Sequence, residues 1–557
     1  MLTTLLAWIY ITFLCWIWGK LFFLSVKKMI QADLQVPHLS ITCITGLAAI
    51  TIIAGILSLM IPLGSWWVQL LFIAPCLILF SRRNPQHFFA GAKKEFQNFH
   101  PLSAVFLSVC LLLILVMSTW TIIHPDTLGY HAQTIQWIEK YKAVPGVVHL
   151  HFRFGLQGLW FVDCALFGFS FFGKDGFTFL NSTVLVWFFI FIINRINYNF
   201  FSEGKKLYGI LWITLLFLTM WSYTQVRLTA TSASPDFIAT LFVLTILYLL
   251  LHKTGIDNWL LPVFLGITAT TIKLSAGPML LIVAAAAIIF LKNRKVTLLL
   301  ALVLISTVSF FPFIARNIIS SGYVVFPSTA IDVANVDWKY NQGLTIHEKK
   351  YITAYAKRPG VETKDEIISA AKMSPLEWLP GWWQHQSIAD QAILCLFVLS
   401  ILAGLLSLNK IIRSGFVPLF SLLTTLTGII FWFINAPDPR FGFGQLLGFI
   451  GIVAYLILKE KEIAVNRSIL SAVLVSFIVI ITAYTGHRFI KFFNGDQLLT
   501  PLGIEKTFYK TFECDGFKIN SPVDNHDFGK IPIPCTDLTC ENFSPRGNKI
   551  TDGFRAK

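Results

Sequence analysis

Charged residues are scarce in this chain. Asp, Glu, Lys and Arg make up 13% of its 557 residues, against about 25% in an ordinary soluble domain. Hydrophobic residues make up 55%, and the mean hydropathy is +0.68. Apolar runs recur along the chain, each close to the roughly 20 residues that cross a bilayer. The scarcity of charge therefore excludes a soluble globular protein and indicates an all-α polytopic membrane protein.

Cysteines with the spacing of a zinc site are also lacking. Cys514, Cys535 and Cys540 lie in a polar tail without a paired CxxC pattern, so zinc is not expected there. If the tail is periplasmic, two of the three can form a disulfide and one is left over, but the sequence does not say which. The other cysteines fall in apolar runs and are interpreted as small buried hydrophobes: Cys15, Cys43, Cys76, Cys110, Cys164 and Cys395.

No basic stretch precedes the first apolar run, and no single basic domain accounts for the net charge of +15. The chain starts Met1-Leu2-Thr3-Thr4, so the first run is expected to stay as a membrane anchor rather than to be cleaved as a signal peptide. The basic residues are spread over loops, which is a signal of membrane topology. We therefore expect no nucleic-acid partner.

The apolar runs and the loop charges together predict a topology of about fourteen spans. The spans are expected at 2–26, 40–61, 66–81, 102–123, 176–194, 207–223, 235–251, 257–273, 276–291, 297–314, 389–408, 416–434, 441–458 and 468–485. With the N-terminus outside, the short outer loops carry little positive charge beyond Arg227 and Arg440, as the positive-inside rule requires. The basic residues then expected inside are Lys27, Lys28, Arg82, Arg83, Lys93, Lys94, Arg195, Lys205, Lys206, Lys253, Lys292, Arg294, Lys295, Lys410, Arg413, Lys459, Lys461 and Arg467.

Residues 155–173 are apolar but are not predicted to span the membrane. A span there would move Arg195 outside and invert every later loop, so we expect a juxtamembrane or interfacial helix. Two loops, 124–175 and 316–388, and a tail over 487–557 then lie at the outer face. The expected organisation is about three helices over 1–100, a module of about eleven helices over 101–486 and a small periplasmic tail.

Charged residues near the ends of the predicted spans gather at the outer face. Asp126 begins the first outer loop just after an apolar run, and Asp236 opens a later span. A carboxylate where a helix leaves the membrane is costly to bury, which favours a functional role. Such a set suits an anionic lipid-linked substrate, with cations on its phosphates and a carboxylate as a base. The cations expected at this face are Arg227, Lys273, Arg316 and Arg440.

Structural explanations stay open for several of these residues. Arg227 and Arg440 can extend to the membrane interface as isolated side chains, and Asp236 can cap its helix. His149 and His151 alternate in an extended segment, but a lone pair is weak evidence for a metal site. No cofactor is assigned, and a divalent metal is kept as an alternative.

Taken in order, these features resemble the GT-C superfamily of integral-membrane glycosyltransferases, which includes protein O-mannosyltransferases and lipid A aminoarabinose transferases. Members carry an Asp or Glu in the first large outer loop, as Asp126 does here, and a basic residue that corresponds in order to Lys273. The resemblance covers about 101–486. Its other motifs are Leu166-Phe167-Gly168, Asp236 to Phe242, Arg316-Asn317 with Gly322 and Phe326-Pro327, and Asp438-Pro439-Arg440-Phe441. Val144-Pro145-Gly146 with Arg153-Phe154-Gly155 is similar to an uncharacterised bacterial subgroup.

The resemblance implies a bacterial inner-membrane enzyme of glycan biosynthesis, with its active site facing the periplasm. It would move a sugar from a polyprenyl-phosphate-linked donor to a glycan, lipid or protein acceptor. Asp126 and Asp236 are the candidate catalytic residues, with Asp126 as the base of an inverting displacement. The candidate substrate- and phosphate-binding residues are Lys273, Arg316, Arg440, Arg227, Tyr130, His131 and Arg153.

Two departures from the family leave the donor and the acceptor open. Thr127 follows Asp126 where O-mannosyltransferases have a second acid, and three extra spans precede the module. One alternative function is an O-antigen polymerase or ligase, which would use Arg358, His347 and His385 of the 316–388 loop. Another is a transporter or flippase of lipid-linked glycans, which would place paired charges near the bilayer midplane.

Overall fold

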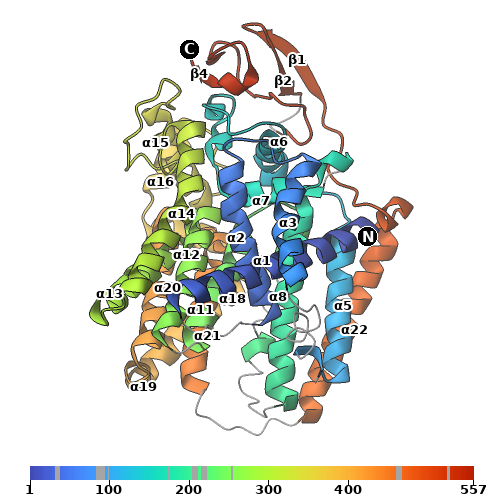
Figure 1. The fold of residues 1–557 in the computed structure, drawn as a ribbon, viewed down its shortest axis with the longest axis vertical. Helices are drawn as coiled ribbons and strands as arrows, with labels where there is room; N and C mark the ends of the chain where they lie inside the picture. The colour runs from blue at the N-terminus through green and yellow to red at the C-terminus, as the bar shows by residue number, and fades with distance from the viewer. Residues whose placement is uncertain are drawn as a thin grey trace.

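The computed structural model describes residues 1–31, 38–82, 95–97, 99–173, 176–202, 211–214, 223–252, 255–458, 467–523 and 527–557. Long helices run side by side through most of the molecule, and short helices and two β-hairpins gather at one end of them (Figure 1). The C-terminus lies in this end region (Figure 1).

The helices follow the apolar runs of the sequence. In chain order they are α1 (Leu2–Ile30), α2 (Leu39–Leu57), α3 (Trp66–Arg82), α5 (Pro101–Met117), α6 (Ala132–Lys140), α7 (Trp160–Leu166), α8 (Phe179–Asn197), α10 (Tyr223–Ala230), α11 (Asp236–His252), α12 (Leu260–Ile272), α13 (Leu281–Lys292), α14 (Val296–Ser321), α15 (Gln342–Lys357), α16 (Lys364–Lys372), α17 (Pro375–His385), α18 (Ile388–Leu406), α19 (Leu408–Ile412), α20 (Phe416–Asn435), α21 (Pro439–Leu458) and α22 (Arg467–Phe492). The strands are β1 (Tyr509–Cys514), β2 (Phe517–Pro522), β3 (Phe543–Pro545) and β4 (Phe554–Ala556).

The chain is a multi-pass helical membrane protein. Within the described residues, nine helices are long and apolar enough to cross a membrane, and the shorter apolar helices include Trp66–Leu79, Pro101–Met117, Asp236–His252 and Ile256–Ile272. Each of these thirteen matches a span predicted from the sequence. Most of the remaining predicted span, 207–223, lies outside the described residues, as do Arg83, Lys93, Lys94, Lys205, Lys206, Lys253, Lys459 and Lys461.

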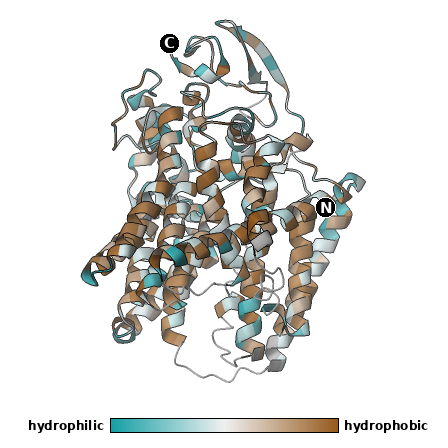
Figure 2. Ribbon diagram, viewed as in Figure 1, coloured by the Kyte–Doolittle hydropathy of each residue, from teal (hydrophilic) through white to brown (hydrophobic). Residues whose placement is uncertain are grey.

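The bundle is apolar both inside and on its sides (Figure 2). Leu300, Val303 and Leu304 of α14 are more than half exposed, and so are Leu399 and Leu402 of α18. Large apolar side chains on the outside of a helix are stable in lipid but not in water. The helix sides therefore fit a hydrocarbon environment.

The first two helices belong to the same core as the rest of the bundle. Gly19 of α1 lies against the carbonyl oxygen of Thr42, and Gly46 of α2 lies against that of Cys15, so a side chain at either glycine would clash. Small residues let membrane helices approach this closely. Ile17 and Leu47 are buried in one hydrophobic cluster with residues as far along the chain as Ile504.

Residues 155–173 form no long helix, because α7 (Trp160–Leu166) lies between the 3-10 turns Phe152–Gly155 and Ser170–Phe172. α7 has seven residues, and all of them are buried. Seven residues give a helix of about 10 Å, a third of a hydrocarbon core. The expectation of an interfacial helix was wrong in one respect, because α7 packs inside the protein against α2 and α6 instead of lying on the membrane surface.

The tail folds over the first outer loop. β1 pairs with β2 and β3 with β4, both antiparallel, and one isolated bridge joins Asn520 to Cys535. Phe528 and Phe554 of the tail share a hydrophobic cluster with Trp137, Leu150 and Phe154 of the loop. We call this end of the bundle, which carries residues 124–159, 322–387 and 499–557, the tail face.

The N-terminus lies beside the start of the tail. The Met1 ammonium donates to the Gln497 carbonyl at 2.5 Å, and Thr3 N donates to the Leu499 carbonyl at 3.1 Å. Both ends of the chain therefore emerge on the same side of the bundle. An even number of spans, as predicted from the sequence, requires this arrangement.

Cys514 and Cys540 form a disulfide, and Cys535 is the cysteine left over, buried and unpaired. We expect an impermeant maleimide to label no tail thiol on intact cells. After mild reduction it should label Cys540, because this residue is partly exposed while Cys514 and Cys535 are buried.

Mass spectrometry of tail peptides would measure this labelling, with Cys540→Ser as the control that removes the signal. Labelling without reductant would contradict the disulfide. A tail that is labelled only after the membrane is opened would place the tail face in the cytoplasm.

Candidate functional site

Six charged side chains meet on the tail face. Three are acids and three are cations, and they come from five separate parts of the chain: Asp126, Arg153, Asp236, Lys273, Asp438 and Arg440. We call this set the charged cluster. Five of the six were expected at the outer face as candidate site residues, and Asp438 was noted only as part of a motif.

Helix ends position the members of the cluster. Asp126 immediately precedes a short π-helix over Thr127–His131, and Arg153 lies in the 3-10 turn Phe152–Gly155. Asp236 is the first residue of α11, and Lys273 immediately follows the last residue of α12. Arg440 is the second residue of α21. Because all of these ends emerge at the tail face, residues far apart in the sequence come together there.

Arg440 is the centre of the charged cluster. Its Nη1 lies 3.3 Å from Asp126 Oδ2, and its Nε lies 3.0 Å from Asp438 Oδ2 and 3.7 Å from Asp236 Oδ2. One guanidinium thus connects all three acids. Arg440 is therefore part of an ion-pair network and not an isolated cation extending to the membrane interface.

Each of the two candidate catalytic acids also has a second cation. Asp126 Oδ1 lies 3.4 Å from Arg153 Nη1, and Asp236 Oδ1 forms an ion pair with Lys273 Nζ. The Asp236 backbone N–H donates to Ser234 Oγ at 3.3 Å. The Asp236 carboxylate forms ion pairs instead of capping the helix.

Aromatic rings support the cations. Lys273 Nζ lies 4.2 Å and Arg440 Cζ 4.7 Å from the centre of the Phe441 ring, and Arg153 Cζ lies 5.4 Å from that of Tyr130. Contacts at these distances stabilise a cation over a ring face. Tyr130, a predicted substrate-binding residue, thus joins the cluster as a support for Arg153.

The charged cluster is balanced and reachable from solvent. Among the described residues, three carboxylates face three basic side chains. Asp126 is 25% and Arg440 26% exposed, whereas Asp236 is 9% exposed. A ligand can therefore reach Asp126 and Arg440 directly, while Asp236 lies deeper.

The Asp126 carboxyl is held in its ionised form. Burial alone would raise its pKa, but Arg440, His131, His124 and Arg153 outweigh burial and hold the pKa well below the usual range. Burial lowers the pKa of His124 to about 4 and that of His131 well below its ordinary value. At neutral pH the acid is therefore charged and both imidazoles are neutral.

Helix α15 borders the cluster from the 316–388 loop. Burial raises the pKa of Glu348 on this helix, and the charge of Arg153 opposes that rise. Burial likewise raises the pKa of Tyr351. The charge of Arg153 opposes that rise, and Tyr355, Glu348 and Asp126 add to it. Glu348 and Tyr351 were not predicted, because nothing in the sequence connects α15 with residues 200 positions earlier.

Two predicted phosphate-binding residues do not join the charged cluster. Arg316 is 5% exposed and donates to Gln157 and Ser58, and no contact within the described residues ties it to the cluster. Arg227 lies over the Trp120 ring, 5.1 Å from its centre. The contacts that the structure shows therefore do not join either residue to Lys273, and a role of Arg316 or Arg227 in binding substrate stays a prediction.

The predicted histidines have separate partners. His131 Nδ1 and Thr127 Oγ1 form a hydrogen bond at 3.1 Å. His149 Nε2 donates to the Trp338 carbonyl at 3.0 Å, while His151 Nε2 lies 3.7 Å from Asp537 Oδ2 in the tail. His149 and His151 thus do not form a pair. In the part of the chain that the structure describes, no three His, Cys, Asp or Glu side chains are grouped as metal ligands.

The residues expected for the alternative polymerase or ligase function lie on or next to helices α15 and α17 of the 316–388 loop. Arg358 and His385 are exposed, and His347 is half-buried on α15. Arg358 follows the end of α15, and His385 ends α17. No contact within the described ranges brings the three together.

Comparison with known proteins gives a family but no function. No curated protein and no solved structure matches the chain. The model of one family, described as Domain of unknown function (DUF8201), matches residues 1–447, which include all six members of the charged cluster. The match covers most of the chain, and the protein therefore belongs to the DUF8201 family.

Proposed function

We propose that this protein is a membrane glycosyltransferase of the GT-C type that uses a polyprenyl-phosphate-linked sugar. The charged cluster is its active site, and the tail face looks into the periplasm from a bacterial inner membrane. The observation that carries the proposal is the meeting of Asp126 and Arg153 of the first outer loop with Arg440 at the start of the apolar helix α21. A lipid-linked donor would present its phosphate at this level of the membrane.

Asp126 is the proposed general base. The acceptor hydroxyl gives its proton to Asp126 while its oxygen attacks the anomeric carbon of the sugar. The bond from that carbon to the phosphate oxygen breaks, and the electron pair leaves with the lipid phosphate. One in-line displacement inverts the anomeric carbon.

Arg440 and Lys273 are the proposed partners of the leaving phosphate. Negative charge grows on the phosphate as the bond breaks, and fixed cations stabilise that charge best where water is excluded. Both residues also contact Phe441, which keeps them beside each other. Asp236 holds Lys273 in place and is less exposed than Asp126, so we assign it a positioning role and not that of the base.

The ion pairs of Asp126 must loosen before it can act. A carboxylate whose pKa is held low by arginines is a weak base. A donor phosphate that draws Arg440 away would remove one of these partners and raise the basicity of Asp126. Donor binding would thus prepare the base, so the protein would not deprotonate an acceptor before a donor is present.

Reconstituted protein with a radiolabelled polyprenyl-phosphate sugar tests the proposal. We expect release of polyprenyl phosphate with transfer of the sugar when extracted periplasmic glycans, lipids or proteins are supplied as acceptors. A protein that translocates the intact donor across the vesicle membrane without releasing the sugar would be a flippase instead.

The pH dependence of kcat/KM follows from the charge state of Asp126. Protonation of Asp126 removes the base. Because the pKa of Asp126 is lowered, this loss is expected only at a pH below about 4, the ordinary pKa of Asp. We therefore expect no decline in kcat/KM between pH 7 and pH 5, measured in the same transfer assay. A decline centred near pH 6.5, the ordinary value for histidine, would indicate a histidine base, as the polymerase or ligase alternative requires.

A further inference from the structure

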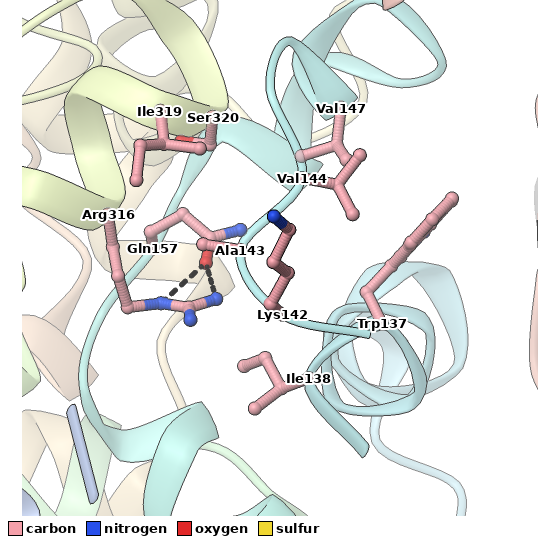
Figure 3. Close-up of a pocket in the computed structure, with 10 residues that line it drawn as sticks. All are labelled: Trp137, Ile138, Lys142, Ala143, Val144, Val147, Gln157, Arg316, Ile319 and Ser320. Carbon is pink, nitrogen blue, oxygen red and sulfur yellow. Dashed lines mark hydrogen bonds between the residues drawn. The ribbon is translucent and has the colours of Figure 1, made fainter. Parts of the chain in front are cut away.

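A cavity beside Arg316 forms a second cationic site on the tail face. The space between its lining side chains is about 280 Å³ when the adjoining open solvent is counted with it. Arg316 and Gln157 form one side, Lys142 projects into it, and Val144, Val147 and Ile319 supply apolar walls (Figure 3).

Arg316 carries a buried charge that the described residues do not neutralise. Its Nε and Nη2 donate to Gln157 Oε1 at 3.1 and 2.5 Å, and its Nη1 donates to Ser58 Oγ at 2.8 Å. Both acceptors are neutral, and no carboxylate in the described ranges pairs with this arginine. A guanidinium stays protonated in proteins, so the charge cannot be relieved by loss of a proton.

Two further donors line the same cavity. Lys142 is exposed and has no ion pair with the described residues. Trp137 is 5% exposed, and its indole N–H has no acceptor within the part of the chain that the structure describes. No Asp or Glu is among the described residues that line the cavity. A lining with donors and positive charge but without acids is suited to an anion.

The cavity is distinct from the charged cluster. Residues 157–159 lie between Arg316 and the end of α12 that precedes Lys273. Gln157 faces Arg316, Gly158 lies against the Ile272 carbonyl, and Leu159 N donates to the Thr271 carbonyl at 2.9 Å.

We propose that this cavity binds a phosphate group through Arg316 and Lys142. The phosphate completes the pairing of the buried guanidinium, while the apolar walls accept the carbon chain or ring that carries it. The site does not depend on the proposed transferase activity. Its phosphate comes either from a lipid headgroup or from a soluble phosphate compound.

Thermal unfolding of the full chain in maltoside micelles tests the site. Inorganic phosphate, titrated at constant ionic strength, should raise the Tm of the wild type in a saturable manner, because a ligand of the folded state stabilises it. Polyprenyl monophosphate added to the micelles identifies a lipid source if it acts at lower concentration. No saturable rise with either compound would overturn the proposal.

Two variants locate the response. Gln157→Glu places a carboxylate beside Arg316, so the Tm without phosphate should rise and the response to phosphate should vanish. Lys142→Gln should weaken the apparent Kd about tenfold, the effect of one charge-assisted contact, whereas Lys349→Gln on the exposed side of α15 should leave it unchanged.

Arg440→Gln separates the two sites. The response to phosphate should persist in this variant, since Arg440 belongs to the charged cluster. If the response is lost in Arg440→Gln but kept in Gln157→Glu and Lys142→Gln, phosphate binds the charged cluster alone and the cavity is not an anion site.

Discussion

Asp126→Asn should lower sugar transfer by about 10²–10⁴-fold, the usual contribution of a general base. The amide is the same size as the carboxylate, and its oxygen can still accept from Arg153 or Arg440, so the charged cluster should keep its shape. What the variant loses is the ability to take a proton. The measurement is the rate of sugar transfer from a radiolabelled polyprenyl-phosphate donor, with protein amount and Tm recorded in parallel.

Asp438→Asn is the matched control for Asp126→Asn. It removes the same charge from the same arginine, because Asp438 Oδ2 binds Arg440 Nε at 3.0 Å. Asp438 also accepts from the Arg440 backbone N–H at 3.1 Å, so its contacts lie within the start of α21. We expect a loss of activity several-fold smaller than for Asp126→Asn. Equal losses in the two variants would mean that charge balance, and not proton transfer, is what Asp126 provides.

Arg440→Gln should reduce transfer by about 10²–10³-fold, comparable to the loss of one preorganised donor to a developing oxyanion. The variant leaves three carboxylates facing two cations, so the Tm should fall as well. Arg440→Lys should recover part of the Tm but little of the activity, because one ammonium cannot serve three partners in the fixed geometry of a guanidinium.

Arg227→Gln is the control for Arg440→Gln. Arg227 and Arg440 were candidates of equal standing in the sequence, but the contact shown for Arg227 is with Trp120 and not with the charged cluster. Transfer within about twofold of wild type is expected for this variant. A loss as large as that of Arg440→Gln would show that the ion-pair network does not mark the active site.

The sequence predicted which residues lie on one face, because apolar runs and loop charges determine the depth of each helix end. Asp126, Asp236, Lys273 and Arg440 could be chosen on that basis. Depth does not determine the position of a helix around the bundle, so it could not separate Arg316 and Arg227 from Lys273. Only the packing of the helices separates them from the cluster.

Other features depended on contacts between distant parts of the chain. The polar tail had no periodic pattern, and Cys514 could be paired with Cys540 only once β1 and β2 were placed. The segment 155–173 was expected to be juxtamembrane or interfacial because it is apolar and a span there would invert the topology, but an apolar helix is equally stable inside a protein. Glu348 approaches Arg153 through the packing of the 316–388 loop, which its local sequence does not reveal.

Binding of a polyprenyl-phosphate analogue to Lys273 variants tests the central claim most directly. If the charged cluster holds the lipid phosphate, Lys273→Ala should bind the analogue more weakly than wild type, and Lys273→Arg should bind it more tightly than Lys273→Ala, because positive charge and reach are both needed. The Gln157→Glu background removes the contribution of the second site. Affinities equal to wild type in both Lys273 variants would show that the lipid phosphate does not bind at the charged cluster.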